Sequence, residues 1–265
     1  MLPRLLRGRY HSSIAAMAAS NFYRARLVER VNFTDDLAMF RFQPDGEFTF
    51  KPGQYATLAV EHDGKLIQRP YSIVSSPYER FLEFFVELVP QGELTPKLWD
   101  LKVSDHVLVR NRIVGAFTRD EKAGMKRHIM AATVTGIAPY MSMIRTHRMD
   151  LDRGGAMEHQ FAVVQGASRS WEFGTYKDEL EQIARQGWAE YVPTVSRPWE
   201  DPDWKGESGR VEDVFRKHAD NLGFNHTNSV GYACGHPQMI ENVKGILARA
   251  GFPKAQIKEE KYFTL

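Results

Sequence analysis

The hydrophobic pattern of the chain changes near the polar stretch 118–128. Before this stretch, short apolar segments are separated by turn sequences rich in Gly, Pro and Asp. After it, apolar runs alternate with segments of helical length and pattern. The first pattern is typical of an antiparallel β-barrel, and the second of βαβ units that build a doubly wound parallel sheet. We therefore expect two domains, for which 265 residues suffice.

The expected elements follow from these two patterns. The first part is predicted to contain six strands, at 24–31, 37–42, 55–60, 67–74, 81–89 and 106–110. The second part is predicted to alternate strands at 129–134, 160–165, 189–195, 229–234 and 257–263 with helices at 139–148, 176–186, 211–219 and 237–250. The domains are expected to span 21–120 and 121–265, after an extension over 1–20.

The first 28 residues contain no acidic residue but several arginines among Ser, Ala and Leu. This composition is typical of a transit peptide. A disordered extension, or a true translation start at Met17, are the alternatives. No run approaches the roughly 18 apolar residues of a membrane span, so we expect a soluble protein without membrane contact. Its expected location is the cytoplasm, or an organellar matrix if 1–16 are a transit segment.

Composition excludes several functions. The single cysteine, Cys234, excludes an intrachain disulfide and cannot hold an iron–sulfur cluster, which needs four protein ligands. His236 has no partner at metal-ligand spacing, so no metal site is expected. The net charge of +2 is too small to indicate nucleic-acid binding.

The sequence Arg69-Pro70-Tyr71-Ser72 ends an expected strand. A guanidinium can hold a pyrophosphate with two hydrogen bonds, a phenol can stack on a flavin ring, and a small hydroxyl can lie near the ring's reactive N5. The alternative interpretation is a solvated strand edge. In either case the strand geometry places Arg and Ser on different sides of Tyr.

A second segment, Gly92 to Leu98 (GELTPKL), follows the fifth expected strand, about 23 residues after Arg69. Glycine lets a backbone approach a phosphate, and the Thr95 hydroxyl with amides at a helix start can bind it. The alternative is an ordinary helix that is capped by Thr95.

Two strand ends in the second part carry small residues. Thr133 to Pro139 (TVTGIAP) forms its first strand-to-helix turn, where dinucleotide phosphates meet a helix N-terminus. Cys234 precedes Gly235 at a later strand end, where a nicotinamide can rest against the small, soft thiol. A plain turn and a buried core cysteine are the alternatives.

Arginines follow three of the later strands or loops. Arg169, Arg197 and Arg210 lie where the carboxyl ends of parallel strands form a ligand crevice. They can bind the 2′-phosphate that distinguishes NADPH from NADH. No acid directly follows the second strand to hold a bare ribose, although Glu172 comes close, and this favours NADP. Solvated surface arginines are the alternative.

The order and spacing of these segments resemble the ferredoxin–NADP(H) reductase family, most closely its bacterial branch, over about 22–263. The resemblance implies a barrel domain for FAD followed by a domain for NADP(H). It implies FAD contacts by Arg69, Pro70, Tyr71, Ser72, Val86, Leu88, Gly92, Leu94 and Thr95. It implies contacts at the nicotinamide cofactor or flavin by Thr135, Gly136, Arg169, Arg197, Arg210, Gly235, Tyr262 and Phe263, with the two terminal aromatic residues as a displaceable lid. Hydride transfer is assigned to Ser72, Cys234 and Glu260.

The resemblance also implies an activity. Hydride passes between NADPH and FAD, and single electrons pass between FAD and ferredoxin or flavodoxin, in a monomer whose Arg24, Arg26 and Lys97 face an acidic carrier. Two departures stand out: Val134 replaces the family's usual glycine, and the spacing from Arg169 to Tyr176 is shifted. A reductase component of an oxygenase and a flavin-binding module without turnover remain as alternatives.

Overall fold

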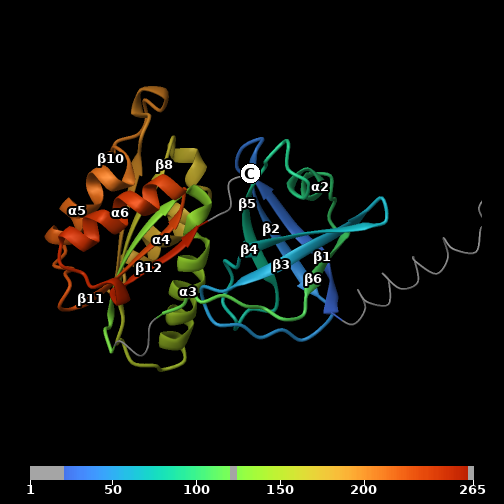
Figure 1. The fold of residues 1–265 in the computed structure, drawn as a ribbon, viewed down its shortest axis with the longest axis horizontal. Helices are drawn as coiled ribbons and strands as arrows, with labels where there is room; N and C mark the ends of the chain where they lie inside the picture. Colours follow the sequence, from blue (N-terminus) through green and yellow to red (C-terminus); the bar gives the residue numbers. More distant parts are fainter. Residues whose placement is uncertain (1–20, 120–123, 262–265) are drawn as a thin grey trace, which may run out of the picture.

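The computed structural model describes residues 21–119 and 124–261. These residues form two β-sheets that lie side by side, with one helix of the second half next to the first (Figure 1). The extension 1–20 and the lid residues Tyr262 and Phe263 lie outside the described residues. The expected domain boundary at 120–121 lies there too, so it stays a prediction.

The first sheet is antiparallel and has six strands, as predicted. They are β1 (Phe22–Asn32), β2 (Leu37–Pro44), β3 (Tyr55–His62), β4 (Lys65–Ser72), β5 (Leu82–Glu87) and β6 (His106–Arg110), in the order β4-β3-β6-β1-β2-β5. Just beyond β4, the backbone N–H of Val74 donates to the carbonyl oxygen of Glu83 in β5 at 2.8 Å. This bond joins the two edge strands and brings the sheet toward a barrel.

Both faces of β2 and β5 are buried, which explains why these strands read as nearly continuous apolar runs. Phe40 and Phe84 point into the barrel core, whereas Met39 and Phe85 join a core shared with the second half of the molecule. Neighbouring residues of a strand point to opposite faces, so one strand serves both cores. The barrel is therefore tied to its neighbour through β2 and β5.

The second sheet is parallel, as predicted. Its strands are β7 (Arg127–Thr133), β8 (Gln160–Ala167), β9 (Ala189–Val195), β10 (Glu207–Ser208), β11 (Ser229–Gly235) and β12 (Ile257–Lys261), in the order β10-β9-β8-β7-β11-β12. The two-residue strand β10 was not predicted, because it is too short to show a hydrophobic period.

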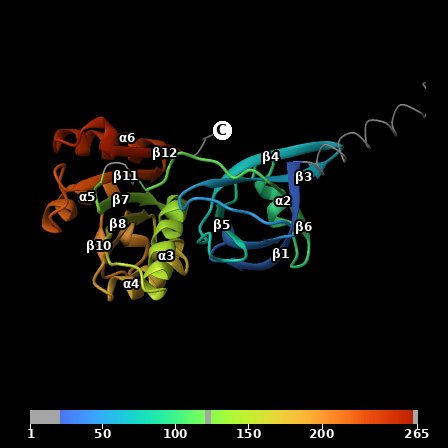
Figure 2. The same cartoon turned by 90° about the horizontal axis from the view of Figure 1, so that it is seen from below.

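Helices cover both faces of this sheet. They are α3 (Ala138–Asp152) and α4 (Tyr176–Ala184) on one face, and α5 (Val211–Asn221) and α6 (Pro237–Arg249) on the other, with the sheet between the two pairs (Figure 2). Within β7, Met130 and Ala132 pack under α3 and α4, whereas Ile129 and Ala131 pack under α5 and α6. This is the doubly wound arrangement that the sequence pattern predicted.

The strand order reverses between β7 and β11, because the chain moves outward from β7 to β10 and then returns to the other side. At such a switch point the loops leave in opposite directions and open a crevice at the carboxyl ends of the strands. The turns after Thr133 and Gly235 lie at this point. Of the described residues, no helix is long and apolar enough to cross a membrane.

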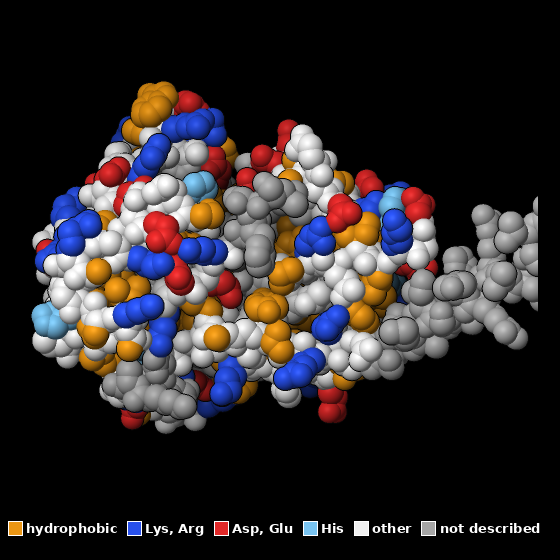
Figure 3. Space-filling model, viewed as in Figure 1, with side chains coloured by type: hydrophobic (Ala, Val, Ile, Leu, Met, Phe, Trp, Pro, Cys, Tyr) orange, Lys and Arg blue, Asp and Glu red, His pale blue; other side chains and the backbone are white. Residues whose placement is uncertain are grey.

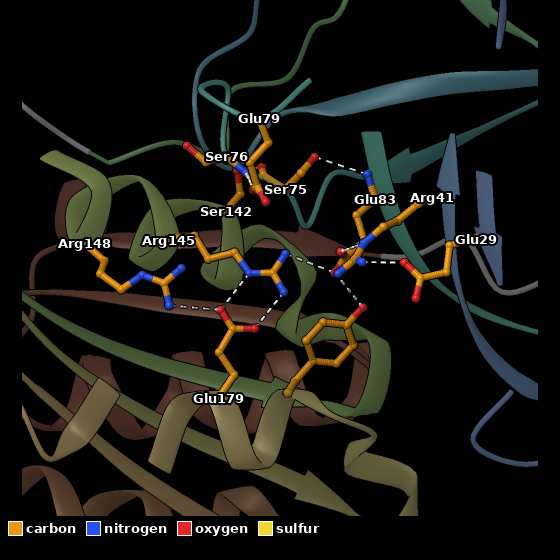
Figure 4. A network of polar contacts seen from close by, with 11 residues as sticks. Glu29, Arg41, Ser75, Ser76, Glu79, Glu83, Ser142, Arg145, Arg148 and Glu179 are labelled. Carbon is orange, nitrogen blue, oxygen red and sulfur yellow. Dashed lines mark hydrogen bonds and ion pairs between the residues drawn. The ribbon is translucent and has the colours of Figure 1, made fainter. Parts of the chain in front are cut away.

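A buried polar network joins the two halves (Figure 4). The Glu83 side chain of β5 is 1% exposed, and its carboxylate accepts hydrogen bonds from Arg145 Nη1 at 3.0 Å, Tyr176 Oη at 3.1 Å and Arg41 Nε at 2.7 Å. Arg145 also binds both carboxylate oxygens of Glu179 in α4, at 2.8 and 2.7 Å. Burial lowers the pKa of Arg145, but the hydrogen bonds and charges of its two acidic partners outweigh this and raise it. The network fixes β5 against α3 and α4.

Candidate cofactor and hydride-transfer site

Two glycines allow a close approach of backbones at the switch point. The 3₁₀ turn η2 (Val134–Ile137) contains Gly136, where a Cβ atom would lie 2.3 Å from the carbonyl oxygen of Cys234. Gly235 has φ of +121°, and a Cβ there would lie 2.2 Å from Thr133 Oγ1. Any side chain at either position would therefore clash. The two glycines therefore let the turns after β7 and β11 lie in direct backbone contact at the switch point, the place where doubly wound sheets bind a dinucleotide.

Val134 adopts a backbone conformation that suits glycine. Its φ is +41°, which is an outlier for a β-branched residue. Its carbonyl oxygen accepts a hydrogen bond from Gln165 Nε2 at 3.2 Å, and its side chain packs at the edge of two apolar clusters. Valine thus replaces the family's usual glycine at position 134, while the backbone keeps the positive φ that glycine adopts easily.

The three residues assigned to hydride transfer lie together at the boundary of the two halves. Ser72, at the end of β4, donates a hydrogen bond to Glu260 Oε2 at 2.7 Å, although 188 residues separate them. Glu260 pairs with Cys234 in the register of β12 and β11, and Cys234 is fully buried. Burial raises the pKa of the Glu260 carboxyl, and the hydrogen bond from Ser72 acts in the opposite direction. A serine hydroxyl and a carboxyl at this distance can exchange or relay a proton.

The residues assigned to the flavin extend from this point along β4. Tyr71 packs edge-on against Phe84, with ring centroids 6.3 Å apart, and burial raises the pKa of its hydroxyl. Arg69 Nη2 forms an ion pair with Glu93, and Arg69 Nη1 donates to the carbonyl oxygen of Gln68 at 2.8 Å. Pro70 is exposed on this edge strand, where no sheet hydrogen bond is lost. The pair with Glu93 brings Arg69 to the glycine-containing loop, as the spacing suggested.

The structure corrects one interpretation of that loop. Helix α2 (Thr95–Trp99) begins at Thr95, and its N-cap residue is Leu94, so Thr95 is not a cap. The Thr95 hydroxyl accepts a hydrogen bond from the Val89 N–H at 2.9 Å and donates one to the Val89 carbonyl at 3.0 Å. The Gly92 N–H donates to the same carbonyl at 2.8 Å. The Thr95 hydroxyl and the Gly92 N–H thus both bind the backbone of Val89, and these hydrogen bonds close the loop.

The remaining flavin-side residues differ in their surroundings. The side chains of Val86 and Leu94 are buried among the barrel's apolar residues. Leu88 is half-buried, and its backbone N–H donates to the Asp36 carbonyl oxygen at 2.7 Å. Direct contact of a cofactor with Val86 or Leu94 would therefore involve backbone, and their assigned roles stay predictions.

The three predicted phosphate-binding arginines lie at the carboxyl edge of the parallel sheet. The Arg197 N–H, after β9, donates to the Ser168 carbonyl oxygen at 3.0 Å, which brings Arg197 next to Arg169, the residue after Ser168. Arg210 is the N-cap residue of α5, and its backbone N–H donates to Asp213 Oδ2 at 3.1 Å. The neighbouring strands β8 and β9 thus bring Arg169 and Arg197 together although they are far apart in sequence.

Two acidic residues accompany these arginines: Glu172, which the sequence placed near the position of a ribose-binding acid, and Glu200, which the sequence did not single out. Arg169 Nη1 donates to Glu172 Oε1 at 3.1 Å, and its Nη2 pairs with Glu200. Glu200 Oε1 also lies 3.8 Å from Arg197 Nη1. The three-residue spacing from Arg197 to Glu200 was the available signal, because residues three apart in a helical turn are neighbours.

Other residues from the sequence reasoning have structural roles. His236 is the N-cap of α6, where its Nδ1 accepts the Gln238 N–H at 3.2 Å, as a capping residue would. The shifted spacing after Arg169 arises from the 3₁₀ turn η3 (Ser170–Phe173) and Gly174, and it places Tyr176 in the contact between the two halves.

The chain matches two family models that together cover most of its length. Residues 24–117 match the oxidoreductase FAD-binding domain, and residues 130–245 match the oxidoreductase NAD-binding domain. The chain therefore carries an FAD-binding and a NAD(P)-binding oxidoreductase domain, in that order.

Curated relatives support the same assignment. A ferredoxin–NADP reductase of Pseudomonas aeruginosa is 28% identical over 88% of this chain and 91% of its own. A flavodoxin/ferredoxin–NADP reductase of Escherichia coli is 32% identical over 74% of this chain and 77% of its own. The fold is also that of a ferredoxin NADP⁺ reductase of Neisseria gonorrhoeae solved with FAD and NADP, with a TM-score of 0.80, 21% identity, and 92% and 99% of the two chains covered.

Proposed function

Because the chain belongs to the family of flavodoxin/ferredoxin–NADP reductases, we propose that it passes electrons between NADPH and a small one-electron carrier, ferredoxin or flavodoxin. The chain is an FAD- and NAD(P)-binding oxidoreductase. When bound, the flavin supplies the exchange between two-electron hydride transfer and one-electron transfer, and the protein supplies binding, orientation and electrostatics. The specific carrier and the preference for NADPH belong to the proposal.

The observation that carries the proposal is the hydrogen bond between Ser72 and Glu260. It joins the end of a flavin-side strand to the strand next to Cys234, at the crevice of the NAD(P)-binding sheet. A hydride passes only between atoms in close contact, so a reductase of this kind needs its two cofactor sites to meet at one point. We propose that Ser72 and Glu260 lie at this point and hold a proton there, which the raised pKa of the buried Glu260 carboxyl supports.

The chain's own residues fit both cofactors. We propose that Arg69 holds the flavin pyrophosphate after exchanging its exposed pair with Glu93, and that Tyr71 supports the ring. Gly136 and Gly235 let the turns after β7 and β11 contact each other, and we propose that the nicotinamide half binds at this contact. Arg169, Arg197 and Arg210 are proposed to bind the 2′-phosphate.

Carrier docking is proposed on the flavin side, where Arg24 and Arg26 are exposed on β1 and Lys97 is half-buried in α2. On the face in Figure 3, the described basic residues are spread over both halves among acidic ones and do not form one patch. Electrostatic steering of an acidic carrier would then come from a few positions, and it should weaken as salt rises.

The first test is the visible spectrum of the purified protein, followed by anaerobic titration with NADPH and, separately, NADH. We expect bound flavin that is bleached by NADPH and then reoxidised by ferredoxin or flavodoxin. A protein that cannot be loaded with FAD, or whose flavin neither nucleotide reduces, would contradict the proposal. The latter result would favour a binding module without turnover, with Val134 as the reason.

A matched pair of variants tests the proposed point of hydride transfer. Ser72→Ala removes the hydroxyl bonded to Glu260, whereas Ser170→Ala alters a serine in η3 on the parallel-sheet half. We expect flavin bleaching by NADPH to slow by about a hundredfold in the first variant, the usual scale for a lost proton-transfer or positioning group, and to stay unchanged in the second. Equal rates in both would remove Ser72 from the reaction.

The alternative function is a reductase component of an oxygenase. The ferredoxin reductase of carbazole 1,9a-dioxygenase shares the fold, with a TM-score of 0.73 and 22% identity, and this chain covers 69% of that one. With one cysteine, this chain cannot supply the ligands of an iron–sulfur cluster, so in the oxygenase role the cluster would lie on a separate protein. Rates with a flavodoxin and with an oxygenase-type ferredoxin distinguish the two functions.

A further inference from the structure

One carboxylate already lies between the two arginines that are proposed to hold the 2′-phosphate. Glu200 pairs through Oε2 with Arg169 Nη2, and its Oε1 lies 3.8 Å from Arg197 Nη1. The side chains of Arg169, Arg197 and Glu200 are 29%, 50% and 36% exposed, so water and ligands can reach them. The two guanidinium groups thus face the two oxygens of one anion.

Backbone contacts hold Glu200 in this position. It ends the 3₁₀ turn η4 (Pro198–Glu200), where Pro198 restricts the backbone. The next residue, Asp201, is 4% exposed, and its Oδ2 accepts the Ser170 N–H at 2.7 Å. This hydrogen bond joins the turn that carries Glu200 to the turn that follows Arg169, so it keeps Glu200 close to Arg169.

The other acid of the cluster is placed differently. The Oε2 atom of Glu172 accepts a hydrogen bond from the Ser168 N–H at 2.9 Å, and its Oε1 accepts one from Arg169 Nη1 at 3.1 Å. It stabilises its own turn. Glu200, in contrast, has arginines as its partners, so it can leave without exposing a backbone N–H.

A carboxylate between two guanidinium groups occupies the position where a phosphate monoester would take the same two positive charges. A 2′-phosphate and Glu200 therefore require the same donors, and at close range their like charges repel. NADH lacks the 2′-phosphate and has no need to displace Glu200. The Glu200 carboxylate should therefore weaken the binding of NADPH and leave the binding of NADH unchanged.

We infer that Glu200 is a specificity-determining residue, an internal competitor that occupies the 2′-phosphate site and reduces the preference for NADPH over NADH. This inference rests on the proposed function, because it requires Arg169 and Arg197 to bind the 2′-phosphate. The inference adds to the proposed function that the carboxylate of Glu200 sets the strength of the preference for NADPH over NADH.

The test is nucleotide binding to the full-length, FAD-loaded protein and to its Glu200→Gln variant. Isothermal titration with 2′,5′-ADP and with 5′-AMP isolates the 2′-phosphate, since this group alone distinguishes the two ligands. We expect the variant to bind 2′,5′-ADP about tenfold more tightly and 5′-AMP unchanged, because one competing charge is removed from a solvent-accessible site. The ratio of kcat/KM for NADPH to that for NADH should rise by a similar factor.

Two further variants control for the charge change and for structure. Glu158→Gln also removes one carboxylate from an exposed pair, with Lys126 at 2.7 Å, but it lies before β8 at the opposite end of the sheet. It should leave both affinities unchanged. Adding Arg169→Gln to the Glu200→Gln variant should abolish the gain for 2′,5′-ADP, which a merely structural effect of residue 200 would not predict.

Each outcome has a separate meaning. Unchanged 2′,5′-ADP affinity in the Glu200→Gln variant would overturn the inference, as would an equal gain for 5′-AMP. If NADPH still reduces the flavin in those cases, the proposed function stands without it. If neither nucleotide reduces the flavin of the native protein, the proposed function fails, whatever the 2′,5′-ADP titration shows.

Discussion

The molecule contains two arginine–carboxylate clusters with the same chemistry and opposite surroundings. In the cluster between the two halves, the Glu83 and Arg145 side chains are 1% and 8% exposed (Figure 4). In the cluster at the edge of the parallel sheet, Arg169 and Glu200 are 29% and 36% exposed. Contacts of similar type thus occur once in the interior and once in reach of water.

This difference separates a structural network from an exchangeable one. A buried charge that loses its partner has no water to replace it, so the free energy of unfolding falls steeply. An exposed charge is solvated when its partner leaves, so the pair contributes little and its arginine is available to a ligand anion. Burial, and not the residue types, therefore decides which cluster holds the fold and which can bind a phosphate.

The strongest test of this comparison is the same substitution in both clusters. Glu83→Gln should lower the free energy of unfolding by about 3 kcal/mol, because Arg145 stays buried with one charged partner removed. Glu200→Gln should leave the urea midpoint unchanged, because its arginines are exposed. Equilibrium urea unfolding of both variants measures the two effects. Equal losses of stability would show that burial does not distinguish the two clusters.

A control within the buried network keeps this result interpretable. Glu29 pairs with Arg41 at 2.5 Å, but its side chain is 45% exposed. Glu29→Gln should cost no more than about 0.5 kcal/mol. A loss as large as that of Glu83→Gln would mean that charge number, and not burial, sets the effect.

A buried ionisable side chain that has no oppositely charged partner should make the free energy of unfolding depend on pH. His128 is fully buried against His159 and Phe161, and burial lowers its pKa from 6.5 to about 3. Its stabilising contribution is present above pH 6.5 and is lost as pH falls toward 3, because the unfolded chain then binds a proton that the folded chain excludes. By pH 5 the loss should reach about 2 kcal/mol.

Urea unfolding from pH 7 to pH 5 checks this expectation. His128→Phe should reduce the pH dependence in this window, and the part that remains comes from its neighbour His159, whose pKa burial lowers to about 4. A change at the exposed His226, such as His226→Asn, should leave the pH dependence as it is in the native protein. A native protein with constant stability over this range would show that burial does not exclude the proton from His128.

The smallest expected effect concerns single hydroxyl groups at the contact between the halves. Tyr176→Phe removes the donor to Glu83 at 3.1 Å but keeps the ring that packs on Phe85, so thermal and urea unfolding should show a loss of about 1 kcal/mol. Tyr78→Phe removes a similar bond, from Tyr78 to Asp150 at 2.8 Å, at a side chain that is 44% exposed. We expect no measurable change there, and equal losses would argue against burial as the deciding factor.

Most of the fold could be predicted because it follows from local patterns. The period of apolar residues placed all six barrel strands and the alternating strands and helices of the second half. Gly136 and Gly235 were recognised from the turns that contain them, and their close backbone contacts are now visible. Thr95 was misinterpreted as a possible cap, because the residues of a helix start do not reveal that Val89 binds its hydroxyl.

The sequence by itself determined the antiparallel and parallel halves and the order of the cofactor segments, because the period of apolar residues and the spacing of motifs carry this information. The assignment of hydride transfer to Ser72, Cys234 and Glu260 came from the family resemblance and stays a prediction. Tertiary structure alone decided that Glu83 meets Arg145 and Tyr176, and that Glu200 meets Arg169. These partners lie 62, 93 and 31 residues apart. The contribution of these contacts to stability or to ligand binding depends on burial and distance, which are set only when the chain has folded.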